Sequence, residues 1–220
     1  RCGMEVSAVG IGCNNFGNRS TVEESKAVIE RALDIGITLF DTADGYPLGN
    51  RGASETIIGE TLGARRKDIV LATKFGIRFN DDMRGGASRA YIMRSVEASL
   101  TRLKTDWIDL YQLHIPDGTT PMEETLRALD DLVSQGKVRY IGNSNFTAWQ
   151  MVDADWTAKA NGLSPFVSCQ NEYSLLNREV DRELLPAMAK YGLGFLPFFP
   201  LASGLLTGKY RRGTNAPEGT

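Results

Sequence analysis

The sequence is poor in the residues on which several classes of protein depend. Its 220 residues include one histidine and three cysteines, Cys2, Cys13 and Cys169, with no CxxC spacing, so neither a disulfide framework nor a zinc site is supported. No apolar run approaches the roughly 18 residues of a membrane span, and nothing at the start resembles a secretory signal peptide. We therefore expect a cytoplasmic protein that holds no metal and does not bind membranes.

An excess of charge of one sign is also missing. The 25 basic and 27 acidic residues give a net charge of −2, which provides no broad cationic surface for phosphate backbones. Nucleic acid is therefore not an expected partner. With 42% apolar and 24% charged residues, the composition is that of an ordinary globular protein. We expect residues 1–220 to form a single domain with one large core.

What the sequence does contain is a regular series of apolar, β-rich runs. Their starts lie about thirty residues apart, the length of a strand with a crossover helix. The runs are SAVGIG near residue 9, ITLFD at 37, IVLATK at 69, WIDLYQLH at 107, VRYIGNS at 138, FVSCQN at 166 and GFLPFF at 194. Strands that alternate with helices in this way indicate a parallel sheet with right-handed crossovers.

The segments between these runs have helical periodicity. In 121–136 the apolar residues that share one face are Met122, Leu126, Leu129 and Val133, and Gly136 follows as a stop. In 21–36 the predicted capping box is Ser20 with Glu23, the predicted apolar face is Val28, Ala32 and Ile35, and the predicted stop is Gly36. Both segments turn directly from a glycine into the next strand.

Seven strands fit either an open doubly wound sheet or most of a closed barrel. The stretch GIGCNNFG has Asn15 where the dinucleotide fingerprint requires a third glycine, and no acidic ribose partner is suitably placed. We therefore favour an α/β fold of the (β/α)₈ TIM-barrel type. Such barrels typically have about 250 residues, so we expect this chain to lack the last β/α unit.

Polar residues follow the predicted strands at their carboxyl ends, where barrel enzymes build their active sites. They are Asp41, Lys74, His114, Ser144 with Asn145, and Gln170 with Asn171. Each has an ordinary structural explanation when taken singly: a turn residue, a solvated lysine, a histidine bonded in the core. Tyr46, in a loop rich in glycine and proline, could equally be a surface ring. No folding requirement, however, places an acid, a lysine and the sole histidine together at strand ends.

The chemistry of these four residues narrows the possibilities. The sequence has no G-x-S-x-G element for a serine hydrolase. A Schiff base on Lys74 would need a lowered lysine pKa, whereas Asp41 beside it favours the charged form. A charged Lys74 near Tyr46 should lower the phenol pKa below its ordinary value of about 10. We expect such a tyrosine to protonate a carbonyl oxygen while a hydride reaches the carbon.

Six motifs make the sequence resemble a known family. They are FDTADGY, LATKFG, LYQLHIPD, GNSNF, CQNEYSLL and PLASGLLTGKY. In order and spacing they resemble the aldo-keto reductases, in the bacterial branch related to the β-subunits of voltage-gated potassium channels. The resemblance runs from VSAVGIG to the final loop, nearly the whole chain.

The resemblance implies a (β/α)₈ barrel that binds NADPH across its carboxyl-terminal mouth and reduces a small carbonyl substrate. It implies Tyr46 as the general acid, Lys74 and Asp41 as the pair that tunes its pKa, and His114 as a donor to the substrate carbonyl. The residues that it implies for cofactor binding are Gly12, Cys13, Asn14, Ser144, Asn145, Gln170, Phe198, Leu201, Ser203, Gly204 and Lys209.

Some features depart from the resemblance or stay open. Asn143 stands where an apolar residue is usual, and Phe199, for which we expect core packing, replaces a small polar residue. Residues 75–90 are predicted to form a mobile loop beside the mouth. The substrate, the oligomeric state and the preference for NADPH over NADH are not encoded in these motifs. Two alternative functions remain: a nicotinamide-binding regulatory subunit that senses redox state with weak catalysis, and a cofactor-free binding scaffold.

Overall fold

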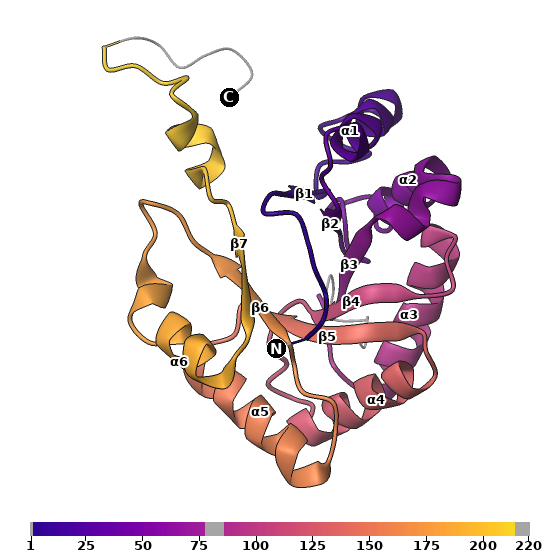
Figure 1. Ribbon diagram of the computed structural model, residues 1–220, viewed down its shortest axis with the longest axis vertical. Helices are drawn as coiled ribbons and strands as arrows, with labels where there is room; N and C mark the ends of the chain where they lie inside the picture. Colours follow the sequence, from indigo (N-terminus) through magenta and orange to yellow (C-terminus); the bar gives the residue numbers. More distant parts are fainter. Residues whose placement is uncertain (1, 78–85, 214–220) are drawn as a thin grey trace.

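The computed structural model describes residues 2–77 and 86–213, and its framework is one parallel β-sheet (Figure 1). The strands follow one another in sequence order across the sheet. They are β1 (Gly10–Gly12), β2 (Leu39–Asp41), β3 (Val70–Phe75), β4 (Ile108–Leu113), β5 (Val138–Ser144), β6 (Ser168–Glu172) and β7 (Gly194–Phe198). All seven predicted strands are therefore confirmed, and every neighbouring pair is parallel.

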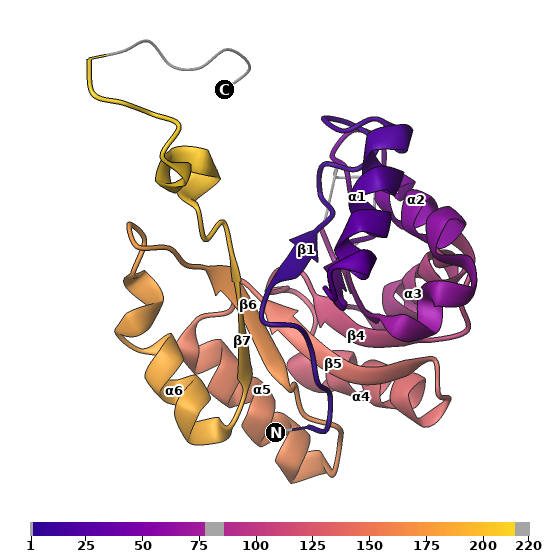
Figure 2. The same cartoon turned by 45° about the horizontal axis from the view of Figure 1, so that its top comes forward.

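Helices connect the strands and lie on the outside of the curved sheet, as Figures 1 and 2 both show. The α-helices are α1 (Val22–Asp34), α2 (Ala53–Leu62), α3 (Arg89–Leu103), α4 (Met122–Ser134), α5 (Ala148–Asn161) and α6 (Leu184–Tyr191). The 3₁₀ helices are η1 (Gly63–Asp68), η2 (Glu179–Asp181) and η3 (Ala202–Thr207). Of the predicted loop at 75–90, residues 78–85 lie outside the described residues.

The sheet curves into a barrel that is open between β1 and β7. Within residues 2–77 and 86–213, no ladder joins these two strands. The main apolar core fills the layer between sheet and helices, and a smaller cluster of Leu39, Ala72 and Leu110 lies inside the barrel. The chain thus holds seven of the eight units of a (β/α)₈ barrel, which confirms the predicted fold class.

Two details of α1 differ from the sequence prediction. The capping box is formed by Thr21 and Glu24, one residue later than predicted, and Ser20 instead pairs with Phe16 in an isolated bridge. The helix buries Ile29 and Ala32, whereas the predicted face residues Val28 and Ile35 are exposed. Of the three predicted face residues, only Ala32 is therefore confirmed.

The prediction for α4 holds better. Leu126 and Leu129 are buried, and Met122 and Val133 are half-buried at the margins of the same face. Gly136 follows the helix with φ +73°, a conformation that glycine adopts without strain. The predicted turn from helix into β5 is therefore confirmed.

Candidate active site

Four side chains that the sequence singled out meet at the carboxyl ends of the first strands. Asp41 is the last residue of β2, Lys74 lies near the end of β3 and His114 directly follows β4. Tyr46 comes from the loop between β2 and α2. We call these four residues the tetrad. Parallel strands place their carboxyl ends on one rim, which is why residues far apart in sequence converge here.

The centre of the tetrad is an ion pair. The Lys74 side chain is fully buried, and its ammonium contacts Asp41 Oδ2 and donates to the carbonyl oxygen of Thr42 at 3.0 Å. A buried ammonium is tolerated only with such partners. This pair therefore fixes the position of a positive charge inside the barrel mouth.

Tyr46 lies against both His114 and the ion pair. Its hydroxyl is 3.2 Å from His114 Nε2, and the two rings meet edge to face with centroids 5.4 Å apart. Lys74 Nζ is 5.3 Å from the centroid of the Tyr46 ring. The phenol thus has a hydrogen-bond partner on one side and an ammonium on the other.

The pKa of Tyr46 differs in direction from the sequence prediction. Burial raises the pKa of this phenol above its ordinary value, Lys74 lowers it and Asp41 raises it. The predicted effect of Lys74 is therefore present, but burial is the larger cause, so the predicted net decrease is wrong for this structure. Tyr46 keeps its proton throughout the neutral pH range.

His114 is neutral in this environment. Burial, and secondarily the charge of Lys74, lowers its pKa from 6.5 to about 3. Its side chain is 7% exposed, and no hydrogen-bond partner of Nδ1 occurs in the described part of the chain. A neutral imidazole next to the phenol can hydrogen-bond without competing as an acid.

The loop that carries Tyr46 is anchored by Asp44, which the sequence reasoning did not single out. The Asp44 amide donates to the Lys74 carbonyl at 2.9 Å. Its Oδ2 accepts from Tyr91 at 3.0 Å, Ser95 at 3.1 Å and Arg51 at 3.3 Å. Burial raises the pKa of Asp44, while Arg51, Tyr91 and Ser95 oppose this shift. The second aspartate of FDTAD, which is Asp44, was the available sequence signal.

Two glutamines complete the surroundings of Asp41. Gln112 Nε2 and Gln170 Nε2 donate to Asp41 Oδ1 at 3.0 and 3.1 Å. Gln170 was predicted as a cofactor ligand, whereas Gln112 was missed. Alternation along β4 could have identified it, because Gln112 lies two residues before His114 and so faces the same side of the sheet.

The predicted nicotinamide-binding residues lie together at the ends of β5 and β6. Asn145, with φ +61°, donates through Nδ2 to the His114 carbonyl at 3.0 Å and to Ser144 Oγ at 3.1 Å. The amide nitrogens of Asn145 and Gln170 are therefore already used within the protein. In the part of the chain described, no protein hydrogen bond to their amide oxygens occurs.

The predicted residues at the end of β1, Gly12, Cys13 and Asn14, divide into two groups. Gly12 and Asn14 are exposed at the strand end. Cys13, in contrast, has a fully buried side chain in the apolar core, where burial raises its pKa. Its thiol is therefore closed off from solvent, although the charges of Asp41 and Lys74 act on it, and its backbone amide donates to the Asp41 carbonyl at 2.8 Å.

The end of β7 contains the predicted aromatic residue. Phe198 is half-buried. Phe199 is 49% exposed with φ +52°, so the predicted core packing is wrong. Its unusual backbone conformation turns the side chain away from the core, and the two rings meet edge to face at 5.3 Å.

Most of the predicted phosphate-binding loop lies in the short 3₁₀ helix η3. Leu201 and Ser203 are exposed. Gly204 has φ +96°, but its amide donates to the Leu201 carbonyl at 3.0 Å, so this predicted backbone donor is used internally. The ammonium of Lys209 lies over Gly204, 3.2 Å from where a Cβ would stand. The glycine thus leaves room for the predicted cation.

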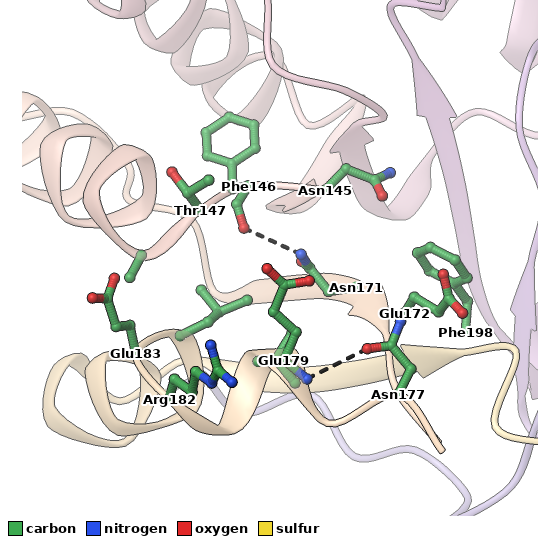
Figure 3. A pocket seen from close by; sticks show the side chains of 13 residues that line it. Asn145, Phe146, Thr147, Asn171, Glu172, Asn177, Glu179, Arg182, Glu183 and Phe198 are labelled. Atoms are coloured by element: carbon green, nitrogen blue, oxygen red, sulfur yellow. Dashed lines mark hydrogen bonds between the residues drawn. The ribbon is translucent and has the colours of Figure 1, made fainter. Parts of the chain in front are cut away.

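A cavity of about 510 Å³ lies beside these strand ends, between the start of α5, the end of β6 and η2 (Figure 3). Asn145 and Phe198 belong to its lining. Asn171 Nδ2 donates to the Phe146 carbonyl at 3.1 Å on one wall. No tetrad side chain lines this cavity, so it is adjacent to the candidate site and not its centre.

Among the residues that the structure describes, no helix has both the length and the apolar character needed to cross a membrane. Likewise, residues 2–77 and 86–213 contain no group of three or more His, Cys, Asp or Glu side chains arranged to hold a metal ion.

Comparison with known proteins identifies relatives over nearly the whole chain. The sequence model of the aldo/keto reductase family matches residues 8–220. The uncharacterised oxidoreductase YrpG of Bacillus subtilis is 43% identical over 219 residues, which cover 95% of this chain and 67% of that protein. A probable voltage-gated potassium channel subunit beta of Oryza sativa is 41% identical, with 97% and 66% coverage. L-glyceraldehyde 3-phosphate reductase of Escherichia coli is 35% identical, with 97% and 63% coverage.

This chain thus spans about two thirds of the length of these relatives. The predicted resemblance is confirmed, including its link to channel β-subunits. Because the family match extends from residue 8 to residue 220 and the fold agrees with it, the chain belongs to the aldo/keto reductase family.

Proposed function

We propose that the complete protein reduces aldehydes or ketones to alcohols with NADPH, and that Tyr46 is the general acid. The observation that carries this proposal is the position of the Tyr46 hydroxyl, 3.2 Å from a neutral His114 and beside the buried Lys74–Asp41 pair. A phenol held in this way keeps its proton until a strongly basic oxygen forms next to it. A carbonyl oxygen that receives a hydride at its carbon is such a base.

The residues at the mouth suit a nicotinamide cofactor. A carboxamide group needs both acceptors and a donor. The amide oxygens of Gln170 and Asn145 are suitable acceptors because their nitrogens are already bonded, and the Ser144 hydroxyl is a suitable donor. Phe198 would contact the ring, and Leu201, Ser203 and Lys209 would bind the phosphates. When bound, the reduced nicotinamide supplies the hydride.

The protein residues then supply placement and a proton. His114, with its proton on Nε2, would donate to the substrate oxygen and orient it. Negative charge develops on that oxygen during reduction, and donors fixed in advance stabilise this charge more than the ground state. Tyr46 would complete the reaction by transferring its proton to the oxygen, which gives the alcohol.

The Tyr46→Phe variant tests this role. We expect it to bind NADPH with unchanged affinity and to lose about 10²- to 10⁴-fold in kcat, the usual contribution of a general acid. Binding is measured by the fluorescence of NADPH, and turnover by the decay of its absorbance with a panel of aldehydes. Tyr173→Phe is the matched control, since Tyr173 bonds Asp181 outside the tetrad. Equal turnover of Tyr46→Phe and wild type would refute Tyr46 as the acid.

A second function is favoured by the 41% identity to a probable channel subunit beta. In this alternative the protein is a regulatory subunit that binds NADPH tightly and turns over slowly. The same absorbance measurement separates the two functions. Rapid decay with at least one aldehyde supports the reductase, whereas tight binding without decay supports the regulatory subunit.

We also propose a domain assignment and a cellular location. The continuous sheet supports assignment of residues 1–220 to a single domain. The free state of Cys2, Cys13 and Cys169 supports a reducing, cytoplasmic location.

A further inference from the structure

Gln112 occupies a central position in the barrel that the tetrad chemistry alone does not explain. It pairs with Lys74 of β3 on one side and Gly142 of β5 on the other. Its side chain is fully buried. A Cβ at position 142 would lie 3.3 Å from Gln112 Cγ and 2.5 Å from Ser168 Oγ. The absence of a side chain at Gly142 therefore leaves the space that Gln112 uses.

The orientation of the Gln112 amide is fixed by chemistry. Its partner, Asp41, is the carboxylate that binds the Lys74 ammonium, and a carboxylate of this kind only accepts hydrogen bonds. The nitrogen of the amide must therefore face Asp41 Oδ1, at 3.0 Å. Its oxygen, Oε1, then points away, and within the described residues it has no hydrogen-bond partner.

The two oxygens of Asp41 have different partners as a result. Oδ1 accepts from Gln112 and Gln170, and Oδ2 is left to the Lys74 ammonium. If the donor from Gln112 were removed, only Gln170 would hold Oδ1. The carboxylate could then rotate and release Lys74 from its present place beside the Tyr46 ring.

We propose that Gln112 is a positioning residue for carbonyl reduction, which holds the Asp41 carboxylate so that Lys74 stays next to Tyr46. This inference rests on the proposed function, since it assigns Gln112 to the same proton transfer. The unpartnered Oε1 supports it. A buried acceptor without a partner costs stability, so packing alone favours an apolar side chain here, whereas the amide donor serves Asp41.

The direction of the effect on Tyr46 follows from its surroundings. The charge of Lys74 lowers the pKa of Tyr46, the charge of Asp41 raises it, and the effect of Lys74 is the larger of the two. An ion pair that is free to move weakens this net lowering. We therefore expect the pKa of Tyr46 to rise when Gln112 loses its donor.

The Gln112→Met variant tests this inference, because methionine is similar in length and volume but donates no hydrogen bond. We expect its denaturant midpoint to equal or exceed that of wild type. We expect kcat for carbonyl reduction to fall roughly ten- to hundredfold, as for other small misplacements near a reacting group, with the Kd of NADPH within about twofold of wild type. Leu110→Met, two residues earlier on β4 and inside the barrel, is the control for packing and should leave the midpoint, kcat and Kd unchanged.

A second readout needs no cofactor and no turnover. Ultraviolet difference titration of the phenols, with and without Tyr46→Phe, isolates the titration of Tyr46 in the wild-type and Gln112→Met backgrounds. We expect this titration to move upward by at least about 0.5 pH unit in Gln112→Met and to stay in place in Leu110→Met.

The outcomes separate the inference from the proposed function. An unmoved titration together with wild-type kcat in Gln112→Met would overturn the inference while leaving the reductase intact. A wild type without any NADPH-dependent turnover, but with the expected shift in titration, would overturn the reductase while supporting the role of Gln112 in positioning Lys74. A denaturant midpoint for Gln112→Met well below those of wild type and Leu110→Met would assign Gln112 to packing and also overturn the inference.

Discussion

At the scale of the single residue, His114 couples the candidate site to the stability of the whole protein. Its imidazole is buried next to an ammonium, and both features oppose protonation. In the unfolded chain the same imidazole takes up a proton at its ordinary pKa of 6.5. Between pH 6.5 and about 3 the unfolded state therefore binds a proton that the folded state does not, so acid favours unfolding.

This linkage predicts the pH dependence of a His114→Asn variant. As pH falls from about 6 to 4, the free energy of unfolding of wild type should decrease relative to the variant by about 1.4 kcal/mol per pH unit. Above pH 7 the difference should be constant. Urea titrations of both proteins at several pH values measure it. A difference that does not change between pH 7 and 4 would contradict the neutral, buried state of His114.

Residue types at the site were predictable from the sequence, but their contacts were not. Asp41, Tyr46, Lys74 and His114 stand at strand ends, and the structure brings them together. The amide nitrogen of Gln170 donates to Asp41. This contact depends on distances across the barrel, which no local sequence pattern encodes. Asn143 points to the opposite face of β5 from Ser144, because side chains alternate along the strand. Within the described residues neither its Nδ2 nor its Oδ1 has a hydrogen-bond partner.

At the scale of the element, α2 and α3 pack closely together on the outer side of β3, the strand that carries Lys74. Glu55 of α2 is fully buried, accepts from Thr73 Oγ1 at 2.6 Å and pairs with Arg102 of α3. Thr73 is next to Lys74 in β3. Gly59, one turn further along α2, lets the helices meet: a Cβ there would lie 2.3 Å from the Arg102 carbonyl oxygen.

Gly59→Ala should therefore destabilise the protein although alanine is the better helix former. Alanine gains about 1 kcal/mol in helix propensity, whereas overpacking against a backbone atom costs about 1–3 kcal/mol, occasionally more. At 2.3 Å the backbones must separate, so we expect a cost at the upper end of this range and a net loss of up to about 2 kcal/mol in the free energy of unfolding, measured with urea. Gly118→Ala, where nothing lies within 4 Å of a Cβ, is the control. Equal midpoints for the two variants would show that the helices part freely.

Element order was the most predictable property of this chain. Apolar runs identified all seven strands, and glycines such as Gly36 and Gly136 identified where helices end. Boundaries were less predictable, since β1 and β2 keep only three residues each of longer apolar runs. The buried face of α1 was predicted only in part: Ala32 is buried as predicted, but Ile29 is buried in place of Val28 and Ile35. Val28 and Ile29 are both apolar and lie about 100° apart on the helix, so periodicity alone did not decide between them.

At the scale of the whole molecule, the edge strands β1 and β7 of the open barrel differ from the central strands in pairing and burial. β4 lies between two strands and all six of its residues are buried. β1 and β7 each pair on one side only within the described residues, and β7 has no fully buried residue. The central strands therefore carry the apolar packing that resists unfolding, while the marginal strands contribute little to it.

This contrast predicts the order of amide hydrogen exchange in the 220-residue chain. Amides of β4 should exchange only through global unfolding, because both neighbours and the helix layer must separate first. Amides of β7 should exchange at least about tenfold faster, through local opening of one ladder. Mass spectrometry of peptides from the labelled chain measures both rates. If β7 were as strongly protected as β4, another segment would have to cover its free edge, and the open margin would not describe the chain in solution.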